Sequence, residues 1–174
     1  MPSEESQISN ILRKLNSEGI PHMIIGGVPA ILYGVERPTY DIDIAVAEDL
    51  EVLAEIIDIL RGLEYNSIHK CPFPHDFLMP IDFITAQFII DKQCVEFRNE
   101  ELELFPVDIL AVGKDLFHEL SKEVIKIPFK NTFLLCPSIQ KLIEMKEAVG
   151  RPEDLEDVRK LRQILGKLEK KYYE

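Results

Sequence analysis

Residues 24–46 read IIGGVPAILYGVERPTYDIDIAV, and this stretch decides how the rest of the chain is interpreted. Gly26 and Gly27 end one apolar run, and Asp41 and Asp43 lie inside a second. Successive side chains of a strand point to opposite faces, so the Asp-Ile-Asp-Ile alternation places both carboxylates on one face and both isoleucines on the other. The sequence predicts two strands joined through a short helix, with two anions at one point.

The paired carboxylates suggest a metal site. Two like charges this close raise each other's pKa unless a cation lies between them. Hard oxygen ligands with open coordination positions favour Mg²⁺ or Mn²⁺, which also bridge substrate phosphates. At the Gly-Gly turn, backbone N–H groups can approach a phosphate because no side chain intervenes. A solvated strand face for the aspartates and a plain tight turn for the glycines are the alternatives.

A spaced string of residues resembles the signature of the DNA-polymerase-beta-type nucleotidyltransferase superfamily, in particular its minimal and AbiEii-like branches: Gly26-Gly27, Ala30, Gly34 and Arg37-x-Thr39-x-Asp41-x-Asp43. The resemblance implies an α/β fold with a mixed β-sheet, helices packed on one side, and C-terminal helices. It also implies nucleotide-binding roles for Gly26, Gly27, Arg37 and Thr39. Many members carry serine after the first glycine of the turn, whereas here a second glycine and then Val28 follow, so any hydroxyl contact to the phosphate is missing.

A third carboxylate is expected on a neighbouring strand, because one more oxygen completes the metal site and can help to activate an attacking hydroxyl. Asp108 is preferred, since it lies in an apolar strand and precedes the order of elements that the resembled families show. Asp82 and Glu96 remain alternatives. Each of the three could instead be an ordinary outward-facing strand residue.

Near the C-terminus, the segment MKEAVGRPEDLEDV resembles a Lys-x-x-x-x-Arg-x-x-Asp-x-x-Asp pattern of AbiEii-like and related small nucleotidyltransferases. Lys146 and Arg151 could converge on phosphate oxygens, with Asp154 and Asp157 holding the arginine in place. The alternative is local: Lys146 is a surface residue, and Arg151 and Asp154 form a pair one helical turn apart.

Composition narrows the class of protein. The chain has 174 residues and a formal net charge of −11, which disfavours an extended nucleic-acid partner because such binding needs clustered Lys and Arg. No apolar run approaches the roughly 20 residues of a membrane helix and no leader pattern begins the chain, so a cytoplasmic protein is expected. Three widely separated cysteines suggest neither a disulfide framework nor a paired zinc motif.

Apolar periodicity and turn residues predict the remaining elements. Helices are expected at 3–19, 28–33, 49–62, near 116–120 and twice after 138. Strands are expected at 21–25, 40–46, 81–84, 88–90, 94–97, 102–112, 123–128 and 131–135. The His- and Cys-containing segment 69–76 is read as an extended loop in preference to a zinc site. We expect a catalytic core at 1–137 and a helical extension at 138–174, or one domain.

Together these features predict a Mg²⁺-dependent nucleotidyltransferase that transfers a nucleoside monophosphate from an NTP to an acceptor hydroxyl, with release of pyrophosphate. The acceptor could be a protein side chain, a tRNA end or a small molecule. The competing hypothesis is an antitoxin-like or regulatory binding module of the same fold, with little activity and with a toxin–antitoxin protein partner. No Gly-Lys-Ser/Thr phosphate loop or His-Glu-x-x-His motif occurs.

Overall fold

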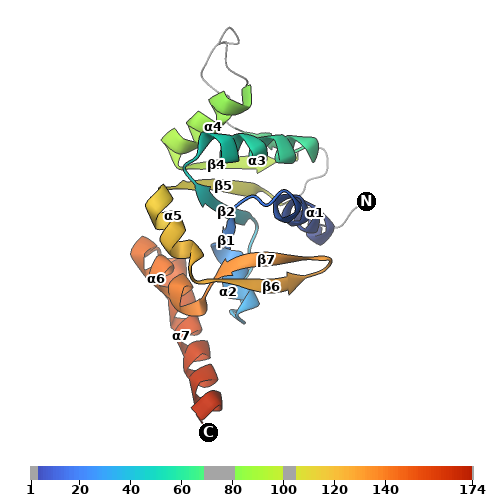
Figure 1. Ribbon diagram of the computed structural model, residues 1–174. Helices are drawn as coiled ribbons and strands as arrows, with labels where there is room; N and C mark the ends of the chain where they lie inside the picture. The colour runs from blue at the N-terminus through green and yellow to red at the C-terminus, as the bar shows by residue number, and fades with distance from the viewer. Residues whose placement is uncertain (1–3, 69–80, 100–104, 174) are drawn as a thin grey trace.

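The computed structural model describes residues 4–68, 81–99 and 105–173 (Figure 1). Within these ranges a five-stranded sheet has the strand order β1-β2-β5-β4-β3. The strands are β1 (Met23–Ile25), β2 (Ile42–Ala47), β5 (Val107–Val112), β4 (Cys94–Arg98) and β3 (Asn66–Ser67). β2 and β5 are parallel, and the other neighbouring pairs are antiparallel. The sheet is therefore mixed, as the sequence predicts.

Three helices cover one face of this sheet: α1 (Glu4–Ser17), α3 (Leu50–Gly62) and α4 (Ile81–Lys92). Alternate residues of the central strands, such as Ile42, Ile44 and Ile109, are fully buried beneath them. The start of α3 is fixed by the Asp49 side chain, which accepts hydrogen bonds from the backbone N–H groups of Glu51 and Val52 at 3.0 and 3.3 Å. The prediction of helices on one side is confirmed for this layer.

The other face is partly covered by α5 (Lys114–Ser121), whose Phe117 and Leu120 pack against Met23 and Ala45 of the sheet. A two-stranded hairpin, β6 (Val124–Phe129) and β7 (Thr132–Pro137), lies next along the chain. It confirms the hairpin that the sequence predicts. The carboxylates described below also lie on this second face.

The C-terminal helices are α6 (Ile139–Val149) and α7 (Pro152–Tyr173), with α7 extending away from the sheet in Figure 1. They pack on α2 (Gly27–Leu32), which directly follows β1. The shared cluster consists of buried residues from both ends of the chain: Ala30, Val35, Leu142, Ile143, Val158 and Leu161. The C-terminal helices are thus attached to the segment that holds the Gly-Gly turn. The division at 137/138 stays a prediction.

One predicted region is wrong. The apolar runs at 81–84 and 88–90 were expected to be strands, but both lie in helix α4. Apolar residues occur on most sides of this segment, so neither the strand nor the helix period stands out, and packing decides. Ala86 and Ile89, three residues apart, are buried against the core. The loop at 69–76 and residues 102–104 of the predicted strand 102–112 lie outside the described residues.

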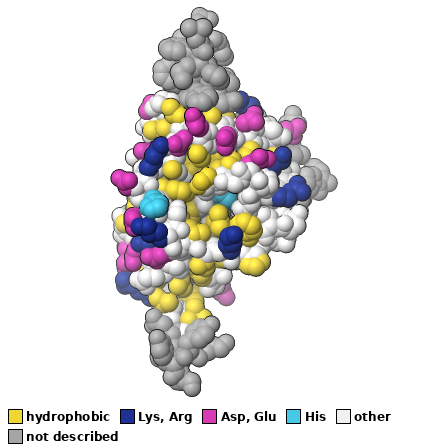
Figure 2. Space-filling view, viewed as in Figure 1, with side chains coloured by type: hydrophobic (Ala, Val, Ile, Leu, Met, Phe, Trp, Pro, Cys, Tyr) yellow, Lys and Arg dark blue, Asp and Glu magenta, His cyan; other side chains and the backbone are white. Residues whose placement is uncertain are grey.

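The described residues contain no helix that is both long and apolar enough to cross a membrane. On the face shown in Figure 2, Lys and Arg side chains are separated by acidic and apolar ones and form no continuous basic surface. Cys94 and Cys136 are both free thiols, and Cys71 lies outside the described ranges.

Candidate active site

A row of carboxylates crosses three neighbouring strands. Asp43 of β2 pairs in register with Asp108 of β5, and Asp108 pairs in register with Glu96 of β4. Their flanking residues, including Ile44 and Ile109, are buried on the helix-covered face, so the three acids lie on the opposite face. Asp41 lies just before β2. The strand pairing therefore places next to one another acidic residues that are distant in sequence.

The charges in this row act on one another. Burial, followed by the charges of Asp41 and Asp108, raises the pKa of Asp43 to about 6. Burial and then the charge of Glu96 raise the pKa of Asp108, and its Oδ1 is buried without a hydrogen-bond partner among the described residues. Glu96 itself accepts a hydrogen bond from Arg98. The row is short of positive charge at the Asp43–Asp108 pair.

The third-carboxylate candidates occupy different places. Asp108 lies directly beside Asp43, and Glu96 lies one strand further from it. Asp82, expected in a strand, belongs to helix α4, which packs on the opposite face of the sheet. Strand geometry therefore favours Asp108, and its catalytic role stays a prediction.

The Gly-Gly turn packs directly against these residues. Gly26 has a φ of 75°, and a Cβ added there would lie 1.9 Å from Oδ2 of Asp43. A Cβ on Gly27 would lie 2.5 Å from Oγ1 of Thr39. Only glycine permits this close approach of the backbone to the carboxylate of Asp43. The turn and the acidic row thus form one continuous surface.

Thr39 and Arg37 connect the turn to other parts of the site. The Thr39 hydroxyl donates a hydrogen bond of 3.2 Å to Oδ1 of Asp41, which orients that carboxylate. The Arg37 guanidinium donates to Oδ2 of Asp157 at 2.6 Å. Arg37 is therefore held by Asp157 of α7. From the sequence, Asp157 was expected to hold Arg151 instead.

Lys146 is the centre of an ion-pair cluster beneath the site. Its Nζ lies 3.1 Å from Asp154 Oδ1 and 2.8 Å from Asp157 Oδ2, and all three side chains are at most 5% exposed. The alternative that Lys146 is a surface residue is wrong. Arg151 donates to Asp154 at 2.6 Å, so the two residues form the expected pair one helical turn apart. The Arg151 side chain nevertheless remains 62% exposed. Both cations lower the pKa of Asp43, so their charges act on the acidic row.

The acidic row fits a divalent metal in its donor chemistry, because carboxylate oxygens are the ligands that Mg²⁺ and Mn²⁺ prefer. The partnerless Oδ1 of Asp108 and the raised pKa of Asp43 both indicate negative charge that the nearby cations offset only in part. Among the residues that the structure describes, no group of three or more His, Cys, Asp or Glu side chains is arranged as a ready-made metal site. Metal binding by Asp41, Asp43 and Asp108 stays a prediction that requires their side chains to adjust.

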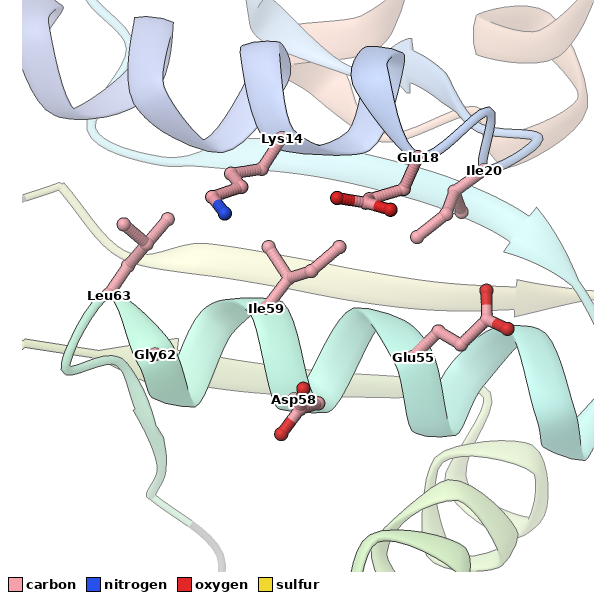
Figure 3. A pocket seen from close by; sticks show the side chains of 8 residues that line it. All are labelled: Lys14, Glu18, Ile20, Glu55, Asp58, Ile59, Gly62 and Leu63. Carbon is pink, nitrogen blue, oxygen red and sulfur yellow. The ribbon is translucent and has the colours of Figure 1, made fainter.

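A separate groove of about 530 Å³ lies between α1 and α3, on the helix-covered side of the sheet (Figure 3). Side chains of both helices extend into it, and the acidic ones among them are exposed to solvent. The groove is lined by Lys14, Glu18, Ile20, Glu55, Asp58, Ile59, Gly62 and Leu63. None of these is a predicted site residue.

No protein-family model and no curated protein sequence matches this chain. Solved structures do. The lincosamide antibiotic adenylyltransferase LnuA, bound to lincomycin, is 18% identical with a TM-score of 0.59, over 92% of this chain and 97% of that one. ANT(2")-Ia in complex with adenylyl-2"-tobramycin is 14% identical with a TM-score of 0.56, over 97% and 98%.

This chain has the nucleotidyltransferase fold. An antigenic nucleotidyltransferase-like protein from Paracoccidioides brasiliensis also shares the nucleotidyltransferase fold, at 13% identity and a TM-score of 0.55, over 95% of this chain and 78% of that one. At these sequence identities, the similarity to the three solved structures establishes the fold alone. The roles of individual residues rest on the geometry above.

The sequence pattern missed two features of the site. It did not pair Arg37 with Asp157, because residues so distant in sequence meet only through the packing of α7. It also passed over Tyr40, which lies between Thr39 and Asp41 and is 74% exposed.

Replacing Gly26 with alanine should destabilise the protein strongly. The new Cβ would collide with Asp43 and would also adopt a strained positive φ, so we expect the free energy of unfolding to fall by about 2–4 kcal/mol. The matched control is Gly19→Ala, which has a φ of 70° but no neighbour within 4 Å, and should cost about 1 kcal/mol. Urea denaturation measures both. Equal losses would show that the contact with Asp43 is unimportant.

Asp43→Asn should stabilise the metal-free protein at neutral pH. Because the folded-state pKa of Asp43 is raised, the folded protein disfavours its ionised form, and removing that charge should add about 1–2 kcal/mol above pH 6. The gain should fade as the pH falls from about 6 towards 3.8, where the wild-type carboxyl is protonated. Denaturation across this pH range in EDTA measures it, with the exposed Asp58→Asn as control. A loss of stability in Asp43→Asn would contradict the expected repulsion.

Lys146→Met should destabilise the protein, because it leaves Asp154 and Asp157 buried with one cation fewer. We expect a loss of about 2–4 kcal/mol, reduced from the full cost of a broken buried pair because Arg37 and Arg151 remain. Arg151→Met removes an exposed partner and should cost about 0–1 kcal/mol. Similar losses in the two variants would show that burial of Lys146 does not set the strength of this cluster.

Proposed function

We propose that this chain is a Mg²⁺- or Mn²⁺-dependent nucleotidyltransferase. It would transfer a nucleoside monophosphate from an NTP to an acceptor hydroxyl. The observation that carries the proposal is the contact of the Gly26–Gly27 turn with Asp43, which itself pairs in register with Asp108. A backbone able to approach phosphates and acidic side chains able to hold a divalent metal then meet at one place. The shared fold of LnuA and ANT(2")-Ia supports this reading.

In the proposed reaction, Asp41, Asp43 and Asp108 hold the metal, and Gly26 and Gly27 bind the β- and γ-phosphates through their backbone. When bound, the metal neutralises charge on the phosphates and stabilises the oxygens of the transferred group. Asp108 also helps to remove the proton of the acceptor hydroxyl. The hydroxyl oxygen forms a new bond to the α-phosphorus, the bond between the α-phosphorus and the bridging oxygen breaks, and pyrophosphate leaves with the electron pair.

Cations next to the acidic row assist in holding the triphosphate. Arg151 is largely exposed and lies close enough to Asp43 to lower its pKa, so its guanidinium can turn towards phosphate oxygens. Lys146 and Arg37 contribute positive charge from pairs with Asp154 and Asp157. Thr39 orients Asp41 and thereby acts on the nucleotide through the metal ligand.

A small-molecule acceptor is our first choice. LnuA is bound to lincomycin, and ANT(2")-Ia is bound to an adenylylated tobramycin, so this fold accommodates such acceptors in those proteins. The formal charge of −11 disfavours an RNA acceptor. A protein hydroxyl remains the second choice. The AbiEii-like branch and a toxin–antitoxin partner rest on the sequence motifs alone.

A binding-only module of the same fold is the second candidate function. It is favoured by one observation, that the described acidic side chains do not form a ready-made three-ligand metal site. In that case the chain would bind a nucleotide or a partner protein without transferring a nucleotidyl group.

Thermal unfolding with each of four NTPs and Mg²⁺ tests nucleotide binding. A ligand at about 100 times its Kd should stabilise the protein by about 2.7 kcal/mol, and EDTA should remove most of this shift. Asp43→Asn should abolish it, judged against the melting temperature of that variant without ligand. If no NTP shifts the wild-type protein, nucleotide binding is ruled out and the enzyme proposal falls.

Transfer is tested by incubating the protein with a cell extract and an NTP labelled on the α-phosphate. We expect label in an acceptor and release of unlabelled pyrophosphate. The same NTP labelled on the γ-phosphate should leave the acceptor unlabelled, which excludes a kinase. Nucleotide binding without transfer of the α-label would favour the binding-only module.

A further inference from the structure

A second groove adjoins the candidate active site. It has a volume of about 330 Å³ and lies between residues 37–41 and the first turns of α7. Asp41, a candidate metal ligand, belongs to its wall, so the groove opens directly beside the acidic row. On the α7 side it is lined by Glu153, Glu156 and Lys160. Its size is within the range of small-molecule sites, about 300–1,000 Å³.

Tyr40 is the unusual residue of this groove. Its side chain is 74% exposed, more than Val149 at 61% or Leu116 at 58%, which are also large apolar residues on the surface. Within the described part of the chain, the Tyr40 side chain makes no hydrogen bond and no ring contact. The ring is thus uncovered at a position next to Asp41, where a flat ligand could stack on it.

The charged groups around the ring are already paired. Glu156 accepts from Arg159 at 2.7 Å, and Lys160 donates to the backbone oxygen of Glu36 at 3.3 Å. Asp157 accepts from Arg37 at 2.6 Å. A strongly charged ligand would have to compete with these pairs, whereas a neutral planar ring would not. The groove therefore suits an aromatic heterocycle better than an ammonium or a phosphate group.

We propose that Tyr40 is the stacking platform for the nucleobase of the NTP, which occupies the groove between residues 37–41 and α7. The inference rests on the proposed function, because it places the base next to the carboxylates that would hold the metal. The triphosphate lies at the Gly26–Gly27 turn, and the base extends past Asp41 to the phenol ring. Stacking alone tolerates every base, since each has a π-face, so Tyr40 contributes affinity for all four NTPs.

Isothermal titration with the preferred Mg²⁺–NTP tests the inference in the absence of any acceptor. Tyr40→Ala should weaken binding roughly tenfold, within the range expected for loss of one base–aromatic stack, and Tyr40→Phe should stay within about twofold of the wild type. Mg²⁺–tripolyphosphate, which has no base, should bind the wild type and Tyr40→Ala equally. Leu155→Ala is the matched control, since Leu155 is 51% exposed on α7 but does not line the groove.

The outcomes separate this inference from the proposed function. Wild-type protein that binds no nucleotide overturns both. Wild-type and Tyr40→Ala proteins that bind the NTP equally overturn only the base site, and a later rise in the acceptor KM of Tyr40→Ala would assign the groove to the acceptor. Equal losses of NTP and tripolyphosphate binding in Tyr40→Ala would also overturn it, because the ring would then act on the phosphates.

Discussion

Repulsion between carboxylates on one face of the sheet is the constraint on which the rest of the structure depends. Strand pairing brings Asp43 beside Asp108, and Asp108 beside Glu96, while the same strands bury isoleucine and valine on the other face. The core therefore fixes the positions of the acids, because a shift of one residue would place them in the apolar layer. Packing of the core maintains an arrangement that electrostatics alone would oppose.

Cations compensate for this repulsion from outside the sheet. Lys146 and Arg151 act on Asp43, and Arg98 acts on Asp108. Lys146 is held between two buried aspartates, and one of these, Asp157, also binds Arg37 next to the Gly-Gly turn. The C-terminal helices therefore belong to the electrostatic design of the site as well as to the packing around α2.

The sequence predicted those parts of the fold that short-range patterns determine. The Asp-Ile-Asp-Ile alternation, the Gly-Gly turn and the hairpin around Lys130 each follow from a few adjacent residues, and the structure contains them. Helix α4 was mistaken for strands because its apolar residues follow neither period clearly. The Arg37–Asp157 pair and the burial of Lys146 could not be predicted, since both depend on where a distant helix packs.

The parallel pairing of β2 with β5 has a consequence for folding. These neighbours are separated along the chain by α3, β3, α4 and β4, so their contact is non-local. Asp43 and Asp108 are far apart until this pairing forms, and their approach then adds an electrostatic barrier to closing the sheet. Because dissolved salt screens such charges, we infer that higher ionic strength speeds the docking of β5 onto β2.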